Sequence, residues 1–473
     1  MGSVTMTNIY VSSSSSSIKI RMAKALNLIQ PRLLPYTRIT FPINPKSPLN
    51  DWQNSLFLTR CSTKQGIGSN NNATSRNPSI ELDSNSISPH FPTPTSNLPL
   101  TQQKSKGLVF ALGPENSWDS AEIGSPIVKR YIGDNEERWY MWYHGMSSDS
   151  DSDSNFDRIG LAVSSNGIHW TRGSEHVSSC GDVGAVMDCS RNWWAFDTES
   201  IRPSELVIMS SPMYSSVYWL YYTGYSSEEM EISRFFNISI ENPERVSHYN
   251  AKPGKVLKSL PGLACSQDGR HWARIEGDYH SGALLDVGSS KEWDSLFISS
   301  PRVVIHQNDD LRMYYHSFDV ENGCFCIGIA RSRDGIRWVK LGKIMGKGKE
   351  GCFDELGTKN ACVVRNGKNG KYLMAYEGVD SNGNRSIGMA ESPDGLKNWK
   401  RVEENPILEA SEGDDRWDSK EVGSPCLIQM EDNEDEWRLY YVGADNEGRT
   451  GIGMAISEGS NFRNFKRGSG LHL

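Results

Sequence analysis

The sequence contains one unit that recurs five times. Every copy opens with an aromatic residue followed by Asp, at Trp118-Asp119, Phe196-Asp197, Trp293-Asp294, Phe353-Asp354 and Trp417-Asp418. About seven residues after this Asp, four of the copies have a small or polar residue followed by Pro and then an apolar run. A run with one or two aromatic residues and a turn that contains Gly follow in the same order. Because each copy must adopt the same local structure, the repeat restricts the fold more than any single motif does.

The runs within each copy have the pattern of β-strands. They are rich in Tyr, Trp, Val and Ile and alternate with a period of two, which is typical of half-buried strands. Asn-Gly or Asp-Gly dipeptides stand between such runs and favour tight hairpin turns, because these turns need a positive φ. Short strands repeated about every sixty residues predict the blades of a β-propeller packed around a central channel.

We therefore predict an all-β fold, a five-bladed β-propeller that covers residues 107–473. The turns of the second to fifth copies lie 66, 60 and 64 residues apart, whereas 102 residues separate the first two. The segment Ser226–Leu260 accounts for the longer interval, and we expect this insert to lie outside the common blade pattern. A β-sandwich is the alternative, but a sandwich gives no reason for one aromatic-Asp pair in each unit.

The first sixty residues have the composition of an organelle address. Residues 1–60 contain seven Lys or Arg against a single acid, Asp51, and a run of six Ser begins at Ser12. Basic, Ser-rich and acid-poor leaders are typical of transit peptides. We predict a transit peptide over 1–60 that directs the chain to the plastid (chloroplast) stroma, with the mitochondrion or the cytoplasm as alternatives. Residues 61–106 are rich in Ser, Asn and Pro and are predicted to form a disordered linker.

Charge and composition exclude several kinds of partner. The net charge is −8, and the excess acid lies in the part of the chain that follows the basic leader. An acidic body does not suit nucleic acid or an anionic membrane surface, and no apolar run of eighteen residues is present to span a membrane. The nine Cys form no Cys-x-x-Cys pair, so we predict neither a metal site nor another cofactor. A small molecule is the expected ligand, and the oligomeric state stays open.

Positions at which the five copies differ are candidates for function, because a residue present in every copy serves the blade. Four residues before the Pro, three of the copies carry Glu122, Glu199 and Glu421. Carboxylates that meet near an axis repel one another unless they are protonated or paired, and Arg202 is a suitable partner. We predict that the three Glu are catalytic, with a solvated rim as the alternative.

A second variable position directly follows the aromatic run. It holds His144, His316 and Glu377 in three of the copies. Since His titrates near neutral pH, these residues are predicted to be catalytic and to relay protons, and the alternative is that they hydrogen-bond within a blade. The residues expected to bind substrate are Arg202, Ser125, Ser300, Tyr143 and Tyr222.

A propeller with a Pro-marked first strand and a Tyr-Tyr second strand resembles the arabinanase/levansucrase/invertase superfamily, typified by glycoside hydrolase family 43. The resemblance covers roughly residues 107–473 and implies two Asp and one Glu on inner strands, which act as acid, base and third carboxylate. It also implies that the two Asp stand directly before the Pro. In this sequence the corresponding places hold Ser125, Arg202 and Ser300, none of which is a carboxylate. Standard hydrolysis is therefore not expected.

Three classes of function remain. The first, which we favour, is a divergent glycoside-hydrolase-like propeller that acts on or binds a small, polar, sugar-like molecule in the central channel. The second is a non-hydrolytic acid/base enzyme of plant small-molecule metabolism, such as an isomerase or a cyclase. The third is a non-catalytic propeller that presents its loops to a protein partner. Fold does not choose among them, but the unequal placement of Glu and His around the ring favours a small-molecule site.

Overall fold

The computed structural model describes residues 105–132, 137–147, 157–211, 214–231, 255–307, 309–431, 433, 435–459 and 461–468. The predicted transit peptide over 1–60 lies outside the described residues, and so does the predicted linker up to residue 104. All described residues belong to one compact unit. They form twenty-two β-strands and no helix, and none of them provides a helix that could cross a membrane. The prediction of an all-β fold is confirmed.

The strands form four sheets that contain five antiparallel groups, which we call blades. The eight-stranded sheet holds two blades, joined by a parallel bridge between Phe325 and Gly357. Blade 1 consists of β2 (Glu122–Ile132), β3 (Glu137–Met146), β4 (Arg158–Ser164), β5 (Trp170–Thr171) and β6 (Gly184–Met187). Blade 2 consists of β7 (Ser200–Ser211), β8 (Tyr214–Glu231), β9 (Lys255–Ser266) and β10 (Ala273–Ile275). Blade 3 consists of β11 (Ser299–Gln307), β12 (Asp310–Asp319), β13 (Cys324–Ser332) and β14 (Val339–Met345). Blade 4 consists of β15 (Gly357–Arg365), β16 (Tyr372–Val379), β17 (Arg385–Ser392) and β18 (Lys400–Arg401). Blade 5 consists of β19 (Glu421–Gln429), β20 (Trp437–Ala444), β21 (Thr450–Glu458), β22 (Asn461–Arg467) and the N-terminal β1 (Leu108–Phe110).

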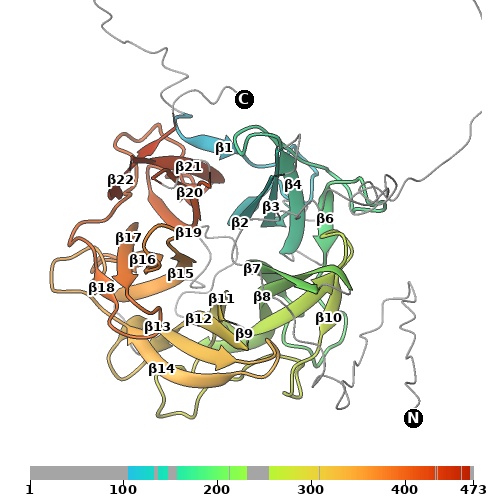
Figure 1. Ribbon diagram of the computed structural model, residues 1–473, viewed down its shortest axis with the longest axis horizontal. Helices are drawn as coiled ribbons and strands as arrows, with labels where there is room; N and C mark the ends of the chain where they lie inside the picture. The colour runs from blue at the N-terminus through green and yellow to red at the C-terminus, as the bar shows by residue number, and fades with distance from the viewer. Residues whose placement is uncertain are drawn as a thin grey trace, which may run out of the picture. The chain divides into compact units, whose positions relative to one another are not determined.

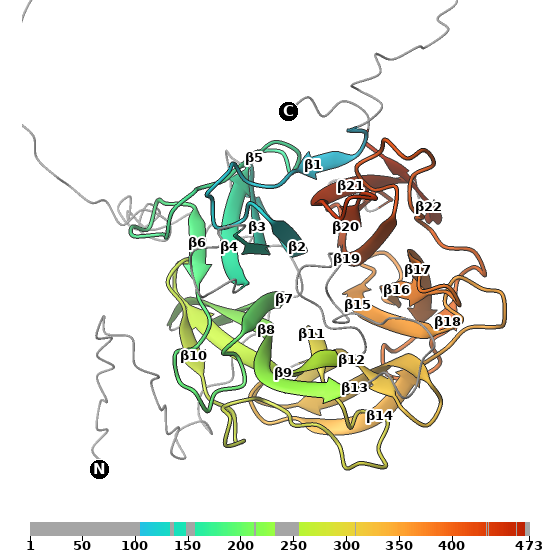
Figure 2. The same cartoon turned by 180° about the vertical axis from the view of Figure 1, so that it is seen from behind.

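The first strands of the blades contact one another in a closed ring, in the order β2, β7, β11, β15, β19 and back to β2. Figures 1 and 2 show the blades around a common centre with these five strands innermost. The ring is closed by β1, which pairs with the same strand of blade 5, β21, as the C-terminal β22. Strands from both ends of the described chain therefore complete one blade, as in a β-propeller.

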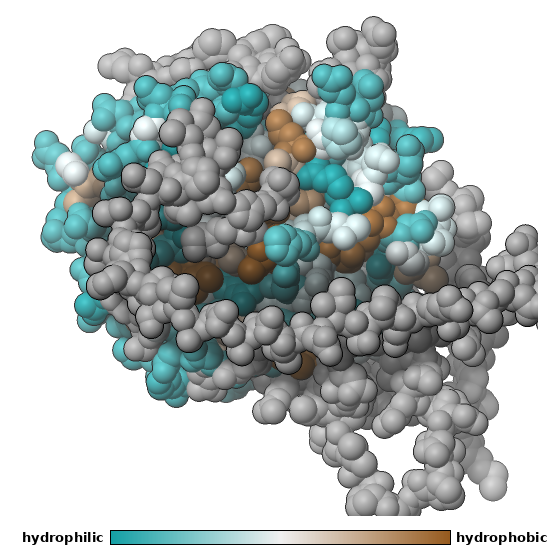
Figure 3. Space-filling view, turned by 90° about the horizontal axis from the view of Figure 1, so that it is seen from above, coloured by the Kyte–Doolittle hydropathy of each residue, from teal (hydrophilic) through white to brown (hydrophobic). Residues whose placement is uncertain are grey.

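The hydrophobic core is divided among the blade interfaces. Five large clusters of buried side chains each combine residues from two neighbouring blades, and together they cover all five interfaces of the ring. On the side drawn in Figure 3, hydrophilic residues make up much of the visible described surface, with smaller hydrophobic areas between them. The apolar side chains thus hold the blades to each other, as predicted from the strand pattern.

The aromatic-Asp pair fastens each blade internally. In blade 1 the Trp118 ring packs on Gly145, where an added Cβ would lie 2.5 Å from the ring, and against the Tyr143 ring at 5.2 Å between centroids. The Tyr143 hydroxyl and the Arg172 guanidinium donate to Asp119 Oδ2 at 2.8 and 2.9 Å. Every other blade repeats this triad of Asp, Tyr and a cation: Asp197, Tyr222 and Arg274; Asp294, Tyr315 and Lys340; Asp354, Tyr376 and Arg401; Asp418, Tyr441 and Arg467. A buried Tyr and a cation are thus the partners of each Asp.

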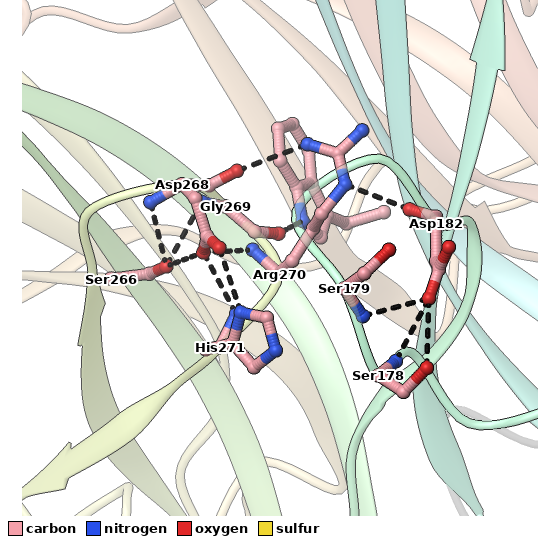
Figure 4. A network of polar contacts seen from close by, with 9 residues as sticks. Ser178, Ser179, Asp182, Ser266, Asp268, Gly269, Arg270 and His271 are labelled. Carbon is pink, nitrogen blue, oxygen red and sulfur yellow. Dashed lines mark hydrogen bonds and ion pairs between the residues drawn. The ribbon is translucent and has the colours of Figure 1, made fainter. Parts of the chain in front are cut away.

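The repeated turn links neighbouring blades at four of the five interfaces. In blade 2, the Ser266 hydroxyl accepts from Gly269 N at 2.9 Å, and Gly269 has the positive φ of 71° that the turn requires. Figure 4 shows this turn, in which Asp268 accepts from His271 N at 2.9 Å and Arg270 reaches Asp182 O at 2.7 Å. At four interfaces an aromatic side chain of the preceding blade donates to the turn Gly carbonyl: Trp142 to Gly269, Tyr221 to Gly335, Tyr314 to Gly395 and Tyr440 to Gly167.

Both ends of the insert Ser226–Leu260 are strands of blade 2 that run past the ends of the corresponding strands in the other blades. Strand β8 continues to Glu231 and β9 begins at Lys255, and the two remain paired out to Glu231 and Lys255. The insert therefore begins as an extension of the second and third strands of blade 2 at the loop end of their hairpin. Residues 232–254 lie outside the described part of the chain.

Candidate functional site

Two clusters of buried charged side chains lie where the first strands begin. The Arg202 cluster joins blades 1 and 2 and contains Glu122, His144, Asp157, Ser200 and Arg202. The Lys359 cluster joins blades 4 and 5 and contains Lys359, Asn360, Glu377, Arg385 and Glu421. Except for Arg385, whose side chain is 14% exposed, all of these residues are buried. Burying an unpaired charge costs folding free energy, so the stability of each cluster depends on how its charges are paired.

Arg202 is the centre of the first cluster. Its Nη2 lies 3.1 Å from Glu122 Oε1 and its Nε lies 2.9 Å from Asp157 Oδ2, so one guanidinium serves two carboxylates. The Ser200 hydroxyl also donates to Asp157 Oδ2. His144 Nε2 lies 3.4 Å from the same Glu122 oxygen, Oε1. The planar guanidinium suits this double contact, which a Lys ammonium would not reproduce.

The surroundings of Glu122 keep it ionised. Burial opposes the charged form, but the Arg202 guanidinium and the hydrogen bond to His144 outweigh it and lower the pKa of Glu122 to about 2. At neutral pH this carboxylate therefore accepts hydrogen bonds and does not donate a proton. Because the carboxylate is the acceptor, His144 Nε2 is the donor in their contact.

The Lys359 cluster alternates two cations with two carboxylates. Lys359 Nζ lies 2.9 Å from Glu377 Oε1, and Arg385 Nε lies 3.1 Å from Glu421 Oε2. Burial opposes ionisation of Glu377, but Lys359 and Arg385 outweigh it and lower its pKa to about 2. Burial, with Arg385 nearby, also lowers the pKa of Lys359. A buried lysine with a lowered pKa is able to exchange a proton closer to neutral pH than an exposed one.

A bulge in the first strand explains why polar residues follow the aromatic run. In four blades the residue before the Pro, or before its Ala counterpart, has a positive φ: Ser125 (46°), Ser300 (52°), Asn360 (49°) and Ser424 (46°). For Ser300, Asn360 and Ser424, the bulge N–H donates to the preceding blade, where the residue after the aromatic run accepts it. Thr223 Oγ1 accepts from Ser300 N at 2.9 Å, His316 Nδ1 from Asn360 N at 3.4 Å, and Glu377 Oε2 from Ser424 N at 3.0 Å.

Two buried imidazole nitrogens have no hydrogen-bond partner among the described residues: His144 Nδ1 and His316 Nε2. Burial, together with the nearby Lys359, lowers the pKa of His316 to about 3, so its ring is neutral. Since Nδ1 accepts from Asn360 N, the proton of the neutral ring is on Nε2, and His316 presents a free N–H donor. Both His residues are nearly inaccessible, at 2% and 1% exposed.

Register separates Glu199 from the other two Glu of its predicted position. Glu122 pairs with Met146 and Glu421 with Ala444, whereas in blade 2 Ser200 pairs with Tyr225, the counterpart of Met146. The reason is that Pro203 occupies the bulge position itself, one residue earlier than in the other blades, and Pro does not adopt a positive φ. Glu199 lies just before β7, half-buried, and its side chain joins neither cluster.

The structure places five of the eleven predicted site residues in the two clusters. Glu122, His144 and Arg202 meet in one cluster, and Glu377 and Glu421 belong to the other. Ser125 and Ser300 stand at bulges, and Ser300 Oγ donates to Asn360 Oδ1 at 2.7 Å. Tyr143 and Tyr222 belong to the Asp triads inside blades 1 and 2, away from both clusters.

Sequence reasoning missed Asp157, Lys359, Asn360 and Arg385. Lys359 has a signal in the repeat, because it and Arg202 take the register position that Gly124 and Gly423 hold in blades 1 and 5. A charged side chain at a register position that holds small residues in the other blades indicates a candidate functional residue. Asp157 and Arg385 stand at or before the start of a third strand, where the five copies show no common pattern.

Solved structures of other proteins resemble this chain in fold. No family model and no curated protein matches this chain. A solved structure described as "Glycoside hydrolase" has 16% identity, covers 76% of this chain and 94% of its own, and superimposes with a TM-score of 0.51. A second, described as a complex of BT0996 and RGII, has 16% identity, coverages of 78% and 97%, and a TM-score of 0.51. The chain therefore shares its fold with a glycoside hydrolase, and the resemblance predicted from the sequence is confirmed at the level of the fold.

Proposed function

We propose that the chain is a five-bladed β-propeller that binds or transforms a small, polar, sugar-like molecule near the beginnings of its first strands. The observation that carries the proposal is the pair of buried imidazole atoms without partners, His144 Nδ1 and His316 Nε2. An unsatisfied buried polar atom costs roughly 1–3 kcal/mol, which a ligand that completes the hydrogen bond recovers. A hydroxyl group both donates and accepts, so a polyhydroxylated molecule is able to serve either kind of nitrogen.

The same residues argue against ordinary glycoside hydrolysis. Hydrolysis needs one protonated carboxylic acid and one carboxylate on opposite sides of the scissile bond. With pKa values lowered to about 2, Glu122 and Glu377 are both ionised near neutral pH. The bulge residues Ser125, Ser300 and Ser424 supply hydroxyls in place of carboxylates. We infer that the chain holds a sugar-like ligand through the unpartnered nitrogens His144 Nδ1 and His316 Nε2, without the acid needed to expel a leaving group.

The buried lysine supports a second candidate function, a non-hydrolytic acid/base reaction. Lys359 lies 2.9 Å from Glu377, and burial lowers its pKa. A base of this kind suits proton abstraction next to a carbonyl group, as in an isomerisation, and this step needs no activated water. Nuclear magnetic resonance in deuterated water tests it, because a carbon-bound hydrogen of a bound keto sugar then exchanges with solvent. Exchange should disappear in Lys359→Met, and no exchange with any keto sugar that binds would contradict this candidate.

Ligand binding is tested by thermal unfolding in the presence of a panel of neutral sugars and polyols, since a ligand of the native state raises Tm. His316→Thr is the informative variant. Thr223 occupies the same position in blade 2 and accepts the bulge amide through Oγ1, so Thr at 316 keeps this bond and removes only the free Nε2. Thr223→Val is the matched control, because it breaks a bulge bond without altering an imidazole.

The expected result is a rise in Tm with at least one sugar for the native chain and for Thr223→Val, and its loss in His316→Thr. Thr223→Val should itself have a lower Tm than the native chain. If no sugar of the panel raises Tm, or if His316→Thr keeps the full rise, the proposed site is wrong. A third possibility, a propeller that contacts a protein partner through its loops, predicts that neither substitution affects partner capture.

A further inference from the structure

A pair of buried thiols stands between the fourth and fifth blades. Cys362 in β15 and Cys426 in β19 hold the same register position in neighbouring first strands, opposite Ala375 and Tyr440. The amide that follows Cys426, Leu427 N, donates to Cys362 Sγ at 3.3 Å. Cys426 Sγ accepts in turn from Val128 N of blade 1 at 3.4 Å. Both cysteines are free, and both are at most 4% exposed.

Among the described residues, this interface lacks one hydrogen bond that the other four interfaces share. At the other four interfaces, an aromatic side chain of one blade donates to the turn Gly carbonyl of the next. The corresponding residue of blade 4 is Ala375, which has no side-chain donor. The thiol pair is therefore placed at the interface where the described part of the ring lacks this hydrogen bond.

The hydrogen bond between the two thiols makes the two sulfurs unequal. The hydrogen bond from the Cys362 thiol, opposed by burial and assisted by the Arg302 guanidinium, lowers the pKa of Cys426 to about 6. Arg302 is held next to the pair because its Nη2 donates to Pro425 O at 3.2 Å. The hydrogen bond with Cys426 and burial raise the pKa of Cys362. One thiolate beside one thiol is the arrangement that oxidation to a disulfide requires.

We propose that Cys362 and Cys426 form a redox-modification site, in which a hydroperoxide oxidises the pair to a disulfide that fastens blade 4 to blade 5. The Cys426 thiolate attacks the distal oxygen of the peroxide, the O–O bond breaks, and Cys426 becomes a sulfenic acid. The Cys362 sulfur then attacks the sulfenic sulfur, the S–O bond breaks, and hydroxide leaves with the proton of Cys362 as water. For hydrogen peroxide the balance is two thiols and one peroxide to one disulfide and two waters. A small oxidant is required because both sulfurs are buried.

A second pair provides an internal comparison. Cys324 Sγ and Cys326 Sγ lie 3.6 Å apart, but both cysteines belong to β13, so a bond between them joins no two blades. Residues two apart in an extended strand also have their Cα atoms near the upper limit of disulfide geometry. Oxidation of this pair should therefore not raise the stability of the ring, whereas the Cys362–Cys426 bond also holds the adjacent bulges Asn360 and Ser424 in place.

The experiment treats the full folded chain with hydrogen peroxide, unfolds it, alkylates the remaining thiols and maps disulfides by mass spectrometry after proteolysis. We expect a linked peptide that contains Cys362 and Cys426, reversed by dithiothreitol, and a rise in Tm of about 5 °C in the oxidised chain. Cys362→Ser and Cys426→Ser should each abolish the linked peptide and the rise, and Cys324→Ser should keep both. Absence of the linked peptide from the folded native chain would overturn the proposal, as would its formation only after unfolding. An oxidised chain with an unchanged Tm would overturn the claim that the bond fastens the blades.

Discussion

The pH dependence of stability gives a direct test of the buried clusters. The pKa values of Glu122 and Glu377 are lowered from the ordinary 4.5 to about 2 in the folded chain. A carboxyl group whose pKa is lower in the folded state stabilises the fold fully above its unfolded pKa and loses this contribution as the pH falls toward the folded pKa. The window is therefore about pH 4.5 to 2. At 1.36 kcal/mol per pKa unit, each of the two groups contributes about 3 kcal/mol at pH 7.

The perturbation that isolates one group is Glu377→Gln, which keeps the shape of the side chain and removes its charge. The variant leaves Lys359 buried beside a neutral amide, with its ion pair at 2.9 Å lost. We expect the free energy of unfolding to fall by about 3 kcal/mol at pH 7, in line with the roughly 3–5 kcal/mol that breaking a buried pair costs. The difference between the two proteins should narrow below pH 4.5 and nearly vanish at pH 2, because Glu377 of the native chain is then protonated as well.

The assay is urea unfolding followed by tryptophan fluorescence at several pH values from about 2 to about 8. Glu122→Gln should behave in the same way, since Arg202 then keeps only one carboxylate partner among the two ion pairs of its cluster. Glu115→Gln, at an exposed position, is the control and should leave the curve unchanged. If Glu377→Gln lowers the free energy of unfolding by the same amount at every pH, the charge of Glu377 is not what stabilises the cluster. If there is no loss at pH 7, the ion pair with Lys359 contributes nothing to the fold.

Three further predictions concern the fold, the activity and the address of the chain. Gly453→Ala should lower the free energy of unfolding, measured by urea unfolding, by about 1–3 kcal/mol, because the added Cβ would lie 2.7 Å from the Trp417 ring. Gly181→Ala is the control, since an added Cβ there meets nothing within 4 Å and should leave the free energy of unfolding nearly unchanged. The purified chain should hydrolyse aryl arabinosides, xylosides and fructosides at near-background rates, and brisk turnover in a chromogenic assay would refute our assignment of the bulge residues. A fluorescent fusion of the full sequence should appear in plastids because of residues 1–60, and a cytosolic signal from the intact fusion would exclude the transit peptide.

The repeat made the fold predictable because its repeated residues have physical roles that recur in every blade. Trp118 needs a residue without a Cβ beneath it, so Gly145 accompanies it in the sequence. Asp119 needs a hydroxyl and a cation, which Tyr143 and Arg172 supply from β3 and from the residue after β5. Each of these contacts lies within one blade, between residues that are close in the sequence. Pattern reasoning therefore identified the blades without knowledge of how they pack.

The candidate site was harder to predict because it depends on contacts between blades. Counting back from Pro selected Glu199, but the bulge in blade 2 falls on Pro203 itself, so Ser200 takes the register position of Glu122. A shift of one residue in a strand turns every side chain to the opposite face, which is why Glu199 misses the cluster. Asp157 reaches Arg202 through space from the end of another loop, and no spacing in the sequence marks this approach.

The position after the aromatic run shows how a structural residue becomes available for function. Thr223 uses its single oxygen to hold the bulge of the next blade, and the same oxygen lies 3.2 Å from the Ser204 hydroxyl, so this side chain has no second polar atom to offer. His316 Nδ1 accepts the bulge N–H of Asn360 in the next blade, and His316 Nε2 has no hydrogen-bond partner among the described residues. At His144 the bulge N–H is missing because Pro203 has none, and the ring turns one nitrogen to Glu122 instead. Replacing Thr by His at this position thus adds a donor without removing the link between blades.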